Sequence, residues 1–206
     1  MARLTIAVSI VLTFASPLVA QNLLVNPGFD NPDLLTGWTC STTYGQAQWI
    51  PDDRLGAPTS GAMEHFVTGG SNNLTVSCLQ CVPVEELYAY AFSTWYYWPD
   101  DPDVTQDGST RLVLIYYSNP DCTSSTGVSS VEVGHHPSLD TWYQLISAEI
   151  TAPAGTTSAL VTVTTWQDLG GDWVRTRLDD LDFSTTTLFR DGFESGGSGA
   201  WTTTFP

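Results

Sequence analysis

Apolar and polar residues alternate along most of this chain, which is the period of a half-buried β-strand. Clusters rich in Gly, Pro and Asp, such as 51–53 and 153–155, separate the alternating segments and favour turns. No segment of helical period interrupts them. We therefore expect an all-β fold, an antiparallel β-sandwich or jelly roll in a single domain. The predicted strands are 23–25, 38–41, 47–50, 62–67, 73–82, 88–98, 111–117, 128–133, 142–150, 158–166 and 173–183.

The segment 88–98 divides its side chains most clearly between two faces. One face is bulky and is predicted to be core: Tyr88, Tyr90, Phe92, Tyr96 and Trp98. The other carries small residues and then Trp95 and Tyr97, which favours a solvated groove. Flat aromatic rings suit the C–H faces of sugars because they offer a large contact area for little conformational entropy. Further candidates are Tyr117, Trp166 and Trp173 for stacking, and Gln144, Arg111 and Glu149 for hydrogen bonds to hydroxyl groups.

The first 20 residues have the pattern of a secretory signal peptide. Arg3 precedes an apolar stretch at 4–14 that is too short for a stable membrane anchor. Small residues then lead to Ala20, so we expect cleavage before Gln21. The sequence thus predicts a protein that is secreted or held at the cell surface, with its main domain at 21–184.

The chain is strongly acidic, with 22 Asp and Glu against 6 Lys and Arg and a formal net charge of −16. Such a surface repels nucleic acids and anionic membranes, because binding to phosphates depends on basic side chains. A hydrophobic content of 42% is high enough for a packed core and argues against disorder. We therefore expect a monomer with a neutral polysaccharide or oligosaccharide as partner, without nucleic-acid binding or membrane insertion.

The 4 cysteines of an exported chain predict two disulfides. A zinc site is less favoured, because Cys40 and Cys122 do not form a second close pair beside Cys78 and Cys81. Cys78 and Cys81 lie three residues apart on a predicted strand, so they face opposite ways and need separate partners. Among the three connectivities we favour Cys40–Cys78 with Cys81–Cys122.

Two short motifs mark the ends of the main domain. Asn26-Pro-Gly-Phe-Asp30 is followed by Trp38, and Arg177-Leu-Asp-Asp-Leu-Asp-Phe183 closes the domain. They resemble the first and last strands of the CBM4/9-type (CenC-like) carbohydrate-binding modules, which are galactose-binding-like β-sandwiches. The looser resemblance between them covers roughly 22–184. It implies a secreted, non-catalytic module that adsorbs polysaccharide in a groove on one sheet.

The same resemblance implies that these two strands are neighbours and that their carboxylates hold a structural calcium. The ligands would be Asp30 with Asp179 or Asp180, since calcium prefers several oxygen ligands. Asp30 stands where the family more often has Glu, which shortens the reach. An ion pair of Asp179 with Arg175 or Arg177 is the alternative to a metal.

Two other functions remain open. A surface, adhesion or structural protein that binds protein partners could use the same fold. An enzyme is less favoured, because the chain has no Gly-x-Ser-x-Gly motif and no distinctive carboxylate pair. We interpret His65 as structural, the pair at 135–136 as a turn, and the acids at 100–107 as a solvated turn or a second calcium loop.

From residue 185 the composition changes. Arg190-Asp-Gly-Phe-Glu194 followed by Trp201 repeats the first motif in a tail that resembles those of exported bacterial proteins. A surface-retention signal and the remnant of a lost second module are both open interpretations of the tail at 185–206.

Overall fold

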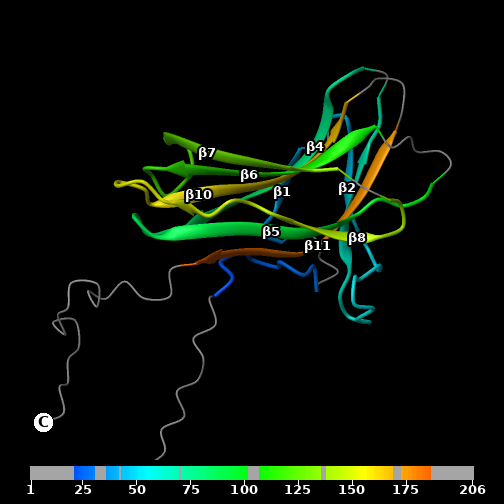
Figure 1. Ribbon diagram of the computed structural model, residues 1–206, viewed down its shortest axis with the longest axis horizontal. Coiled ribbons are helices and arrows are strands. Elements are labelled where there is room, and N and C mark those ends of the chain that lie inside the picture. Colours follow the sequence, from blue (N-terminus) through cyan, green and yellow to red (C-terminus); the bar gives the residue numbers. More distant parts are fainter. Residues whose placement is uncertain are drawn as a thin grey trace, which may run out of the picture.

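The computed structural model describes residues 21–30, 36–41, 43–69, 71–101, 107–135, 138–168 and 173–186. The predicted signal peptide and nearly all of the C-terminal tail lie outside these ranges. In the described ranges the secondary structure consists of strands, arranged as two packed sheets (Figure 1). The predicted all-β sandwich is confirmed. Within these ranges there is also no helix that could span a membrane.

Every strand pairing is antiparallel. The five-stranded sheet has the order β1 (Thr39–Ser41), β4 (Leu74–Pro83), β10 (Ser158–Gln167), β6 (Gly108–Tyr117) and β7 (Ser125–Gly134). The six-stranded sheet has the order β2 (Gly45–Ile50), β3 (Ala62–Val67), β11 (Val174–Thr185), β5 (Ala89–Tyr97) and β8 (Trp142–Ile146), and β9 (Ile150–Thr151) also pairs with β5.

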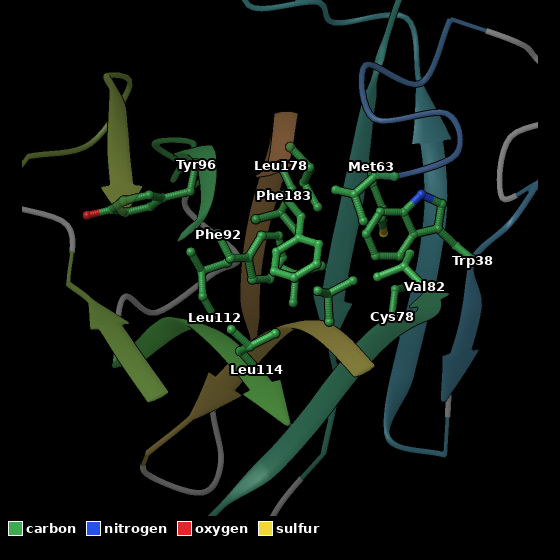
Figure 2. Packing of buried hydrophobic residues seen from close by; sticks show 14 of the residues in the cluster. Trp38, Met63, Cys78, Val82, Phe92, Tyr96, Leu112, Leu114, Leu178 and Phe183 are labelled. Atoms are coloured by element: carbon green, nitrogen blue, oxygen red, sulfur yellow. The ribbon is translucent and has the colours of Figure 1, made fainter. Parts of the chain in front are cut away.

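The core lies between the two sheets and follows the predicted alternation. Tyr90, Phe92, Tyr96 and Trp98 are buried, which confirms the predicted core face of β5, and Tyr88 at its start is half-buried. In Figure 2, aromatic and aliphatic side chains of β5 and β11 point toward those of β6 and β4. Burial of each large apolar side chain stabilises the fold by about 1.5–3 kcal/mol.

The predicted strand at 23–25 is wrong as regular structure, although its position is as the resemblance implied. The segment lies along β11: the Leu23 N–H donates to the Phe183 carbonyl at 2.8 Å, and the Leu181 N–H donates to the Pro27 carbonyl at 2.9 Å. Asn26 and Phe29 have positive φ angles of 51° and 52°. Such left-handed residues interrupt the extended backbone that a strand needs.

The predicted strand at 142–150 is divided into β8 and β9. The break comes at Ser147, whose N–H donates to the Phe92 carbonyl at 2.8 Å. The Ser147 hydroxyl oxygen accepts the Phe92 N–H at 2.9 Å, so a side chain replaces one bond of the ladder.

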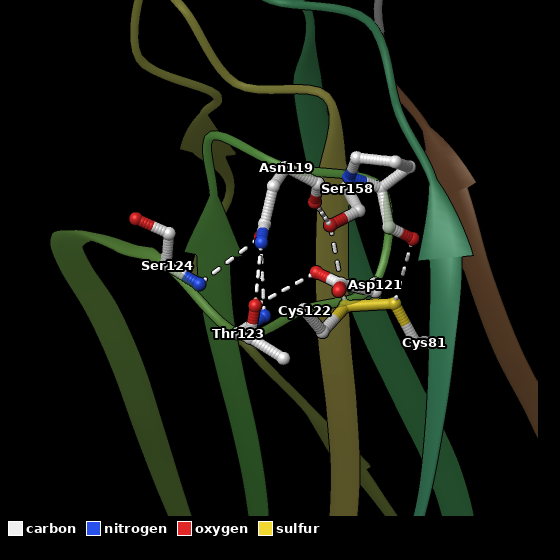
Figure 3. Close-up of a disulfide and its surroundings, with 8 residues drawn as sticks. Cys81, Asn119, Asp121, Cys122, Thr123, Ser124 and Ser158 are labelled. Atoms are coloured by element: carbon white, nitrogen blue, oxygen red, sulfur yellow. Dashed lines mark hydrogen bonds between the residues drawn. A yellow bond between two sulfur atoms is a disulfide. The ribbon is translucent and has the colours of Figure 1, made fainter.

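Both predicted disulfides are confirmed. Cys40–Cys78 joins β1 to β4, and Cys81–Cys122 joins β4 to the connection between β6 and β7. Figure 3 shows how this connection closes beside the second disulfide. Its Asn119 side-chain oxygen accepts the N–H groups of Thr123 and Ser124, at 3.1 and 3.0 Å. The Ser158 hydroxyl donates to the Asn119 carbonyl at 2.6 Å, which anchors the connection to β10.

Candidate functional site

The predicted sugar-contact residues lie on two different faces of the sandwich. Trp95 and Gln144 are register partners on the outer face of the six-stranded sheet, and Tyr97 lies beside them on β5. Tyr117 and Trp166 lie on the outer face of the other sheet, opposite Ser158 and Ser109. The structure therefore brings three of the predicted residues together and separates two.

A continuous row crosses the six-stranded sheet through Tyr97. Strand register aligns one outward residue from each strand in the order β8, β5, β11, β3 and β2. These residues, called the Trp142–Gln48 row below, are Trp142, Tyr97, Arg177, Glu64 and Gln48. Sequence analysis missed Trp142, Glu64 and Gln48 as site residues, because alternation shows which face a residue occupies but not which strands are neighbours.

Contacts link the members of the row. The rings of Trp142 and Tyr97 lie 5.2 Å apart between centroids, and the Arg177 guanidinium lies 5.2 Å from the centre of the Tyr97 ring. Arg177 Nε is 3.5 Å from a carboxylate oxygen of Glu64. Gln48 Nε2 donates to the other Glu64 oxygen at 2.9 Å. Aromatic surface, cation, carboxylate and amide thus follow one another across neighbouring strands.

Glu64 organises the charges of this face. Its side chain is only 7% exposed, a position that costs free energy unless the carboxylate is paired. Arg175 Nε is 3.9 Å from the same carboxylate. Arg175 lies two residues before Arg177 on β11 and pairs in register with Phe66. The two arginines continue outward to Asp101 and Asp52, each at 2.5 Å. The network holds both guanidinium groups against the sheet.

Arginines also cover several of the aromatic rings. The Arg54 guanidinium lies 4.3 Å from the centre of the Trp95 ring, and Arg111 lies 3.9 Å from that of Trp166. The outward faces of these two predicted stacking residues are therefore partly occupied, and Arg177 lies over the Tyr97 ring at the longer distance of 5.2 Å. Among the described residues, no guanidinium lies over Trp142 or over Trp173, which is 46% exposed.

The Tyr97 hydroxyl is held in place by Asp140. It donates to Asp140 Oδ1 at 2.7 Å, and the same oxygen accepts the Asp100 N–H at 2.8 Å. Partial burial, followed by the hydrogen bond to Asp140, raises the pKa of Tyr97 to about 12. The phenol therefore stays protonated, and its ring keeps one orientation beside Trp142.

The predicted calcium ligands on β11 are held by an arginine that the sequence did not single out. The ladder is irregular between Asp179 and Asp182, and Asp180 has a φ of 47°. The Asp179 carboxylate is buried and accepts the Arg54 N–H at 2.9 Å and the Asp180 N–H at 2.7 Å. Arg54 Nε donates to Asp180 at 2.8 Å, with Nη2 on the same oxygen. The predicted alternative, an ion pair of Asp179 with Arg175 or Arg177, is wrong: those arginines pair with Glu64, Asp101 and Asp52, and it is Asp180 that pairs with Arg54.

The fit of these residues to a metal ion is limited by Arg54. Asp30 and Asp180 line one hollow of about 340 Å³, together with Asp182, Gly28 and Ser60. However, the Asp180 oxygen that bonds Arg54 would have to release it to bind a cation. Within the described part of the chain, no three acids, histidines or cysteines are arranged to hold a metal. In this arrangement the residues do not fit the ion, so calcium stays a prediction from the sequence.

His65 is structural, as predicted. It is fully buried, with Nδ1 at 3.2 Å from the Thr165 hydroxyl and Nε2 at 3.3 Å from Cys78 Sγ. Burial lowers its pKa to about 3, so the ring is neutral in the folded protein.

The sequence matches no protein-family model and no curated protein. Solved structures do align with it. The module TmCBM61, determined with β-1,4-galactotriose, aligns with a TM-score of 0.56 and 16% identity over 81% of this chain and 99% of the module. The CBM22-1 xylan-binding domain of Paenibacillus barcinonensis Xyn10C gives 0.55 and 11%, over 84% and 100%. The chain has the β-sandwich fold of these modules.

Enzymes appear among the similar structures as well. The enzymatically active domain of tailspike protein 4 of bacteriophage CBA120 aligns with a TM-score of 0.56 and 13% identity. The alignment covers 80% of this chain but only 21% of that domain, so the chain spans about a fifth of its length. At identities this low, the structural similarity shows the shared fold alone, and the finer assignment to the CBM4/9 group stays a prediction.

Proposed function

We propose that this chain is a secreted, non-catalytic carbohydrate-binding module. It adsorbs a neutral polysaccharide across the outer face of its six-stranded sheet. The observation that carries the proposal is the Trp142–Gln48 row, in which two adjoining rings lead into a guanidinium, a carboxylate and an amide. Since neighbouring strands lie about 4.8 Å apart, the row spans about 19 Å, enough to contact several sugar units.

Each part of the row suits one part of a sugar. The ring of Trp142, with that of Tyr97 beside it, offers apolar surface to the C–H face of a pyranose. Arg177 and Gln48 provide donors for hydroxyl groups, and Gln144 is exposed beside Trp95 as a further amide. Because ion pairs with Glu64 and Asp52 already hold Arg177, binding requires little additional ordering of its side chain.

The charge around the row favours a neutral ligand. Asp52, Asp101 and Asp140 surround it, and they bond Arg177, Arg175 and Tyr97 respectively. These arginines are already neutralised by acids, so an incoming uronate or phosphate would meet a net negative surface. The similarity in fold to TmCBM61 and to the xylan-binding CBM22-1 domain supports carbohydrate as the ligand class.

Depletion of the protein from solution by a panel of insoluble neutral polysaccharides tests the proposal. We expect one class, such as β-glucan, xylan, mannan or galactan, to remove the protein, and polygalacturonate to leave it in solution. Parallel runs with calcium and with chelator test the calcium prediction. Retention by none of these polysaccharides would overturn the proposal.

A second candidate is a surface or adhesion protein that binds protein partners. The observation in its favour is a set of exposed valines on the edge strand β7: Val131 is 54% exposed and Val133 is 42% exposed. An exposed edge strand with apolar side chains is a common site of pairing with another chain. Sedimentation that shows self-association, together with no retention by the panel, would favour this candidate.

A further inference from the structure

Two adjacent hollows lie at the end of the sandwich around Tyr88, far from the Trp142–Gln48 row. Their volumes are about 410 and about 490 Å³, and both are lined by Glu85 and Tyr88. Pockets of this size are typical of small-ligand sites. The two hollows are called the Tyr88 pocket below. None of its lining residues belongs to the row.

The first hollow combines apolar and polar lining residues. Leu23, Val84 and Tyr90 supply apolar or aromatic surface, and Gln21 and Thr185 supply polar groups. The Tyr90 hydroxyl oxygen accepts the Glu85 N–H at 2.9 Å, which fixes the connection that precedes Tyr88. A sugar ring has the same combination of an apolar face and a polar edge.

Hydrogen bonds fix the walls of the second hollow. The Val84 N–H donates to the Thr157 carbonyl at 3.2 Å, and the Ala152 N–H donates to the Tyr88 carbonyl at 2.8 Å. The Gly155 N–H donates to a carboxylate oxygen of Glu86 at 2.5 Å. The pocket is thus largely formed before any ligand arrives, which reduces the entropy lost on binding.

Tyr88 is the aromatic residue that the two hollows share, and its ring is half-buried. Thr156 also lines the second hollow, but it is 3% exposed and its hydroxyl oxygen is buried, with no hydrogen-bond partner among the described residues. That oxygen is out of reach of a ligand in the hollow. The Tyr88 ring is therefore the surface on which a sugar would stack.

We infer that the Tyr88 pocket is a second saccharide site, which holds neutral sugar units on the two sides of the Tyr88 ring. The inference rests on the proposed carbohydrate ligand but not on its position in the six-stranded sheet. Glu85 and Glu86 can accept bonds from sugar hydroxyl groups, and no arginine lines either hollow. The same acids disfavour uronic acids and sulfated sugars.

The two sites are independent because β5 separates them. Tyr88 precedes the first residue of β5 and Tyr97 is its last. At about 3.3 Å per residue, nine residues place them roughly 30 Å apart. One long glycan could occupy both sites, or two glycans could be cross-linked.

Titration calorimetry with a soluble oligosaccharide of the class that retains the protein tests the inference. We expect two equivalents to bind to the wild type, and Tyr88→Ala and the double variant Tyr97→Ala/Trp142→Ala each to lose a different one. Tyr88→Phe keeps the ring and is the matched control, so it should bind as the wild type does.

The outcomes separate the two proposals. A single equivalent that Tyr88→Ala leaves unchanged would overturn this inference and leave the proposed function standing. Loss of all binding in Tyr88→Ala, with Tyr97→Ala/Trp142→Ala unaffected, would support the Tyr88 site and overturn the one on the sheet. Absence of saccharide binding in the wild type would overturn both.

Discussion

Arg54 shows how one loop residue can change the role of several others. Through Asp179, Asp180 and the Trp95 ring, it fastens the connection between β2 and β3 to β11 and β5. Period-two alternation correctly places Trp95 outward. It cannot reveal a guanidinium above the ring, because the partner lies 126 residues from Asp180 along the chain. Contacts made by loops are the part of this site that the sequence pattern does not contain.

Replacement of Arg54 tests whether Arg54 or a calcium ion neutralises Asp179 and Asp180. Arg54→Gln removes the charge-assisted bonds to Asp180, so we expect the free energy of unfolding to fall by about 1–2 kcal/mol. Arg111→Gln is the matched control: it also removes a guanidinium over a tryptophan, but its nearest acid, Asp168, is 3.8 Å away.

Calcium should compete with Arg54 for Asp180. The melting temperature of the wild type is therefore expected to be the same with calcium and with chelator, while calcium raises that of Arg54→Gln. A clear rise in the wild type would show that the ion displaces Arg54, and would support the calcium site that the sequence predicts. Differential scanning fluorimetry of both proteins checks this.

His65 should make stability depend on pH. Its pKa is about 3 when folded and near 6.5 when unfolded, so its contribution is complete above pH 6.5 and is lost as the pH falls toward 3. Asp179 acts oppositely. Burial raises its pKa to about 7, against the lowering effect of the N–H bonds from Arg54 and Asp180. Its contribution to the free energy of unfolding is therefore complete at low pH and is lost as the pH rises toward 7.

The prediction therefore compares the free energies of unfolding of the wild type and His65→Asn, because Asp179 titrates in both proteins. The advantage of the wild type in unfolding free energy should shrink by roughly 2 kcal/mol between pH 7 and pH 4.5. Urea titrations at the two pH values measure it. A constant difference would show that His65 does not titrate on unfolding.

At the scale of elements, the alternating pattern predicts most strands to within a few residues. It fails where the backbone departs from an extended ladder. Asn26 and Phe29 adopt left-handed angles at the N-terminal segment, and the Ser147 side chain takes a backbone partner between β8 and β9. Neither event changes the order of apolar and polar residues, so periodicity alone cannot detect it.

The Cys81–Cys122 disulfide should stabilise the attachment of the β6–β7 connection to β4. It closes a loop of 41 residues between β4 and the β6–β7 connection, and the loop entropy it removes from the unfolded chain corresponds to about 4 kcal/mol. The double variant Cys81→Ser/Cys122→Ser should lower the free energy of unfolding by about this amount, as measured by urea denaturation. A loss below about 1 kcal/mol would indicate that the hydrogen bonds of Asn119 and Ser158 suffice to hold the connection.

At the scale of the whole molecule, the alternating pattern and the two end motifs predict the correct fold, and the number and spacing of the cysteines predict both disulfides. They did not lead to the Trp142–Gln48 row, since its members come from five strands whose order, β2-β3-β11-β5-β8, differs from their order in the chain. Because the sequence does not reveal the order of the strands, Trp95 and Trp166 were predicted to share one site, although they lie on opposite faces of the sandwich.

The most direct test of the account compares the two faces. Tyr97→Ala/Trp142→Ala removes the rings of the row, and Tyr117→Ala/Trp166→Ala removes the same kinds of ring from the five-stranded sheet. Affinity is measured by depletion on the polysaccharide that retains the wild type, after circular dichroism has shown that both variants are folded. We predict at least a tenfold loss of affinity for the first variant, equivalent to about 1.4 kcal/mol, and little change for the second. Unchanged affinity in the first variant, with a loss in the second, would contradict the placement of the glycan on the six-stranded sheet.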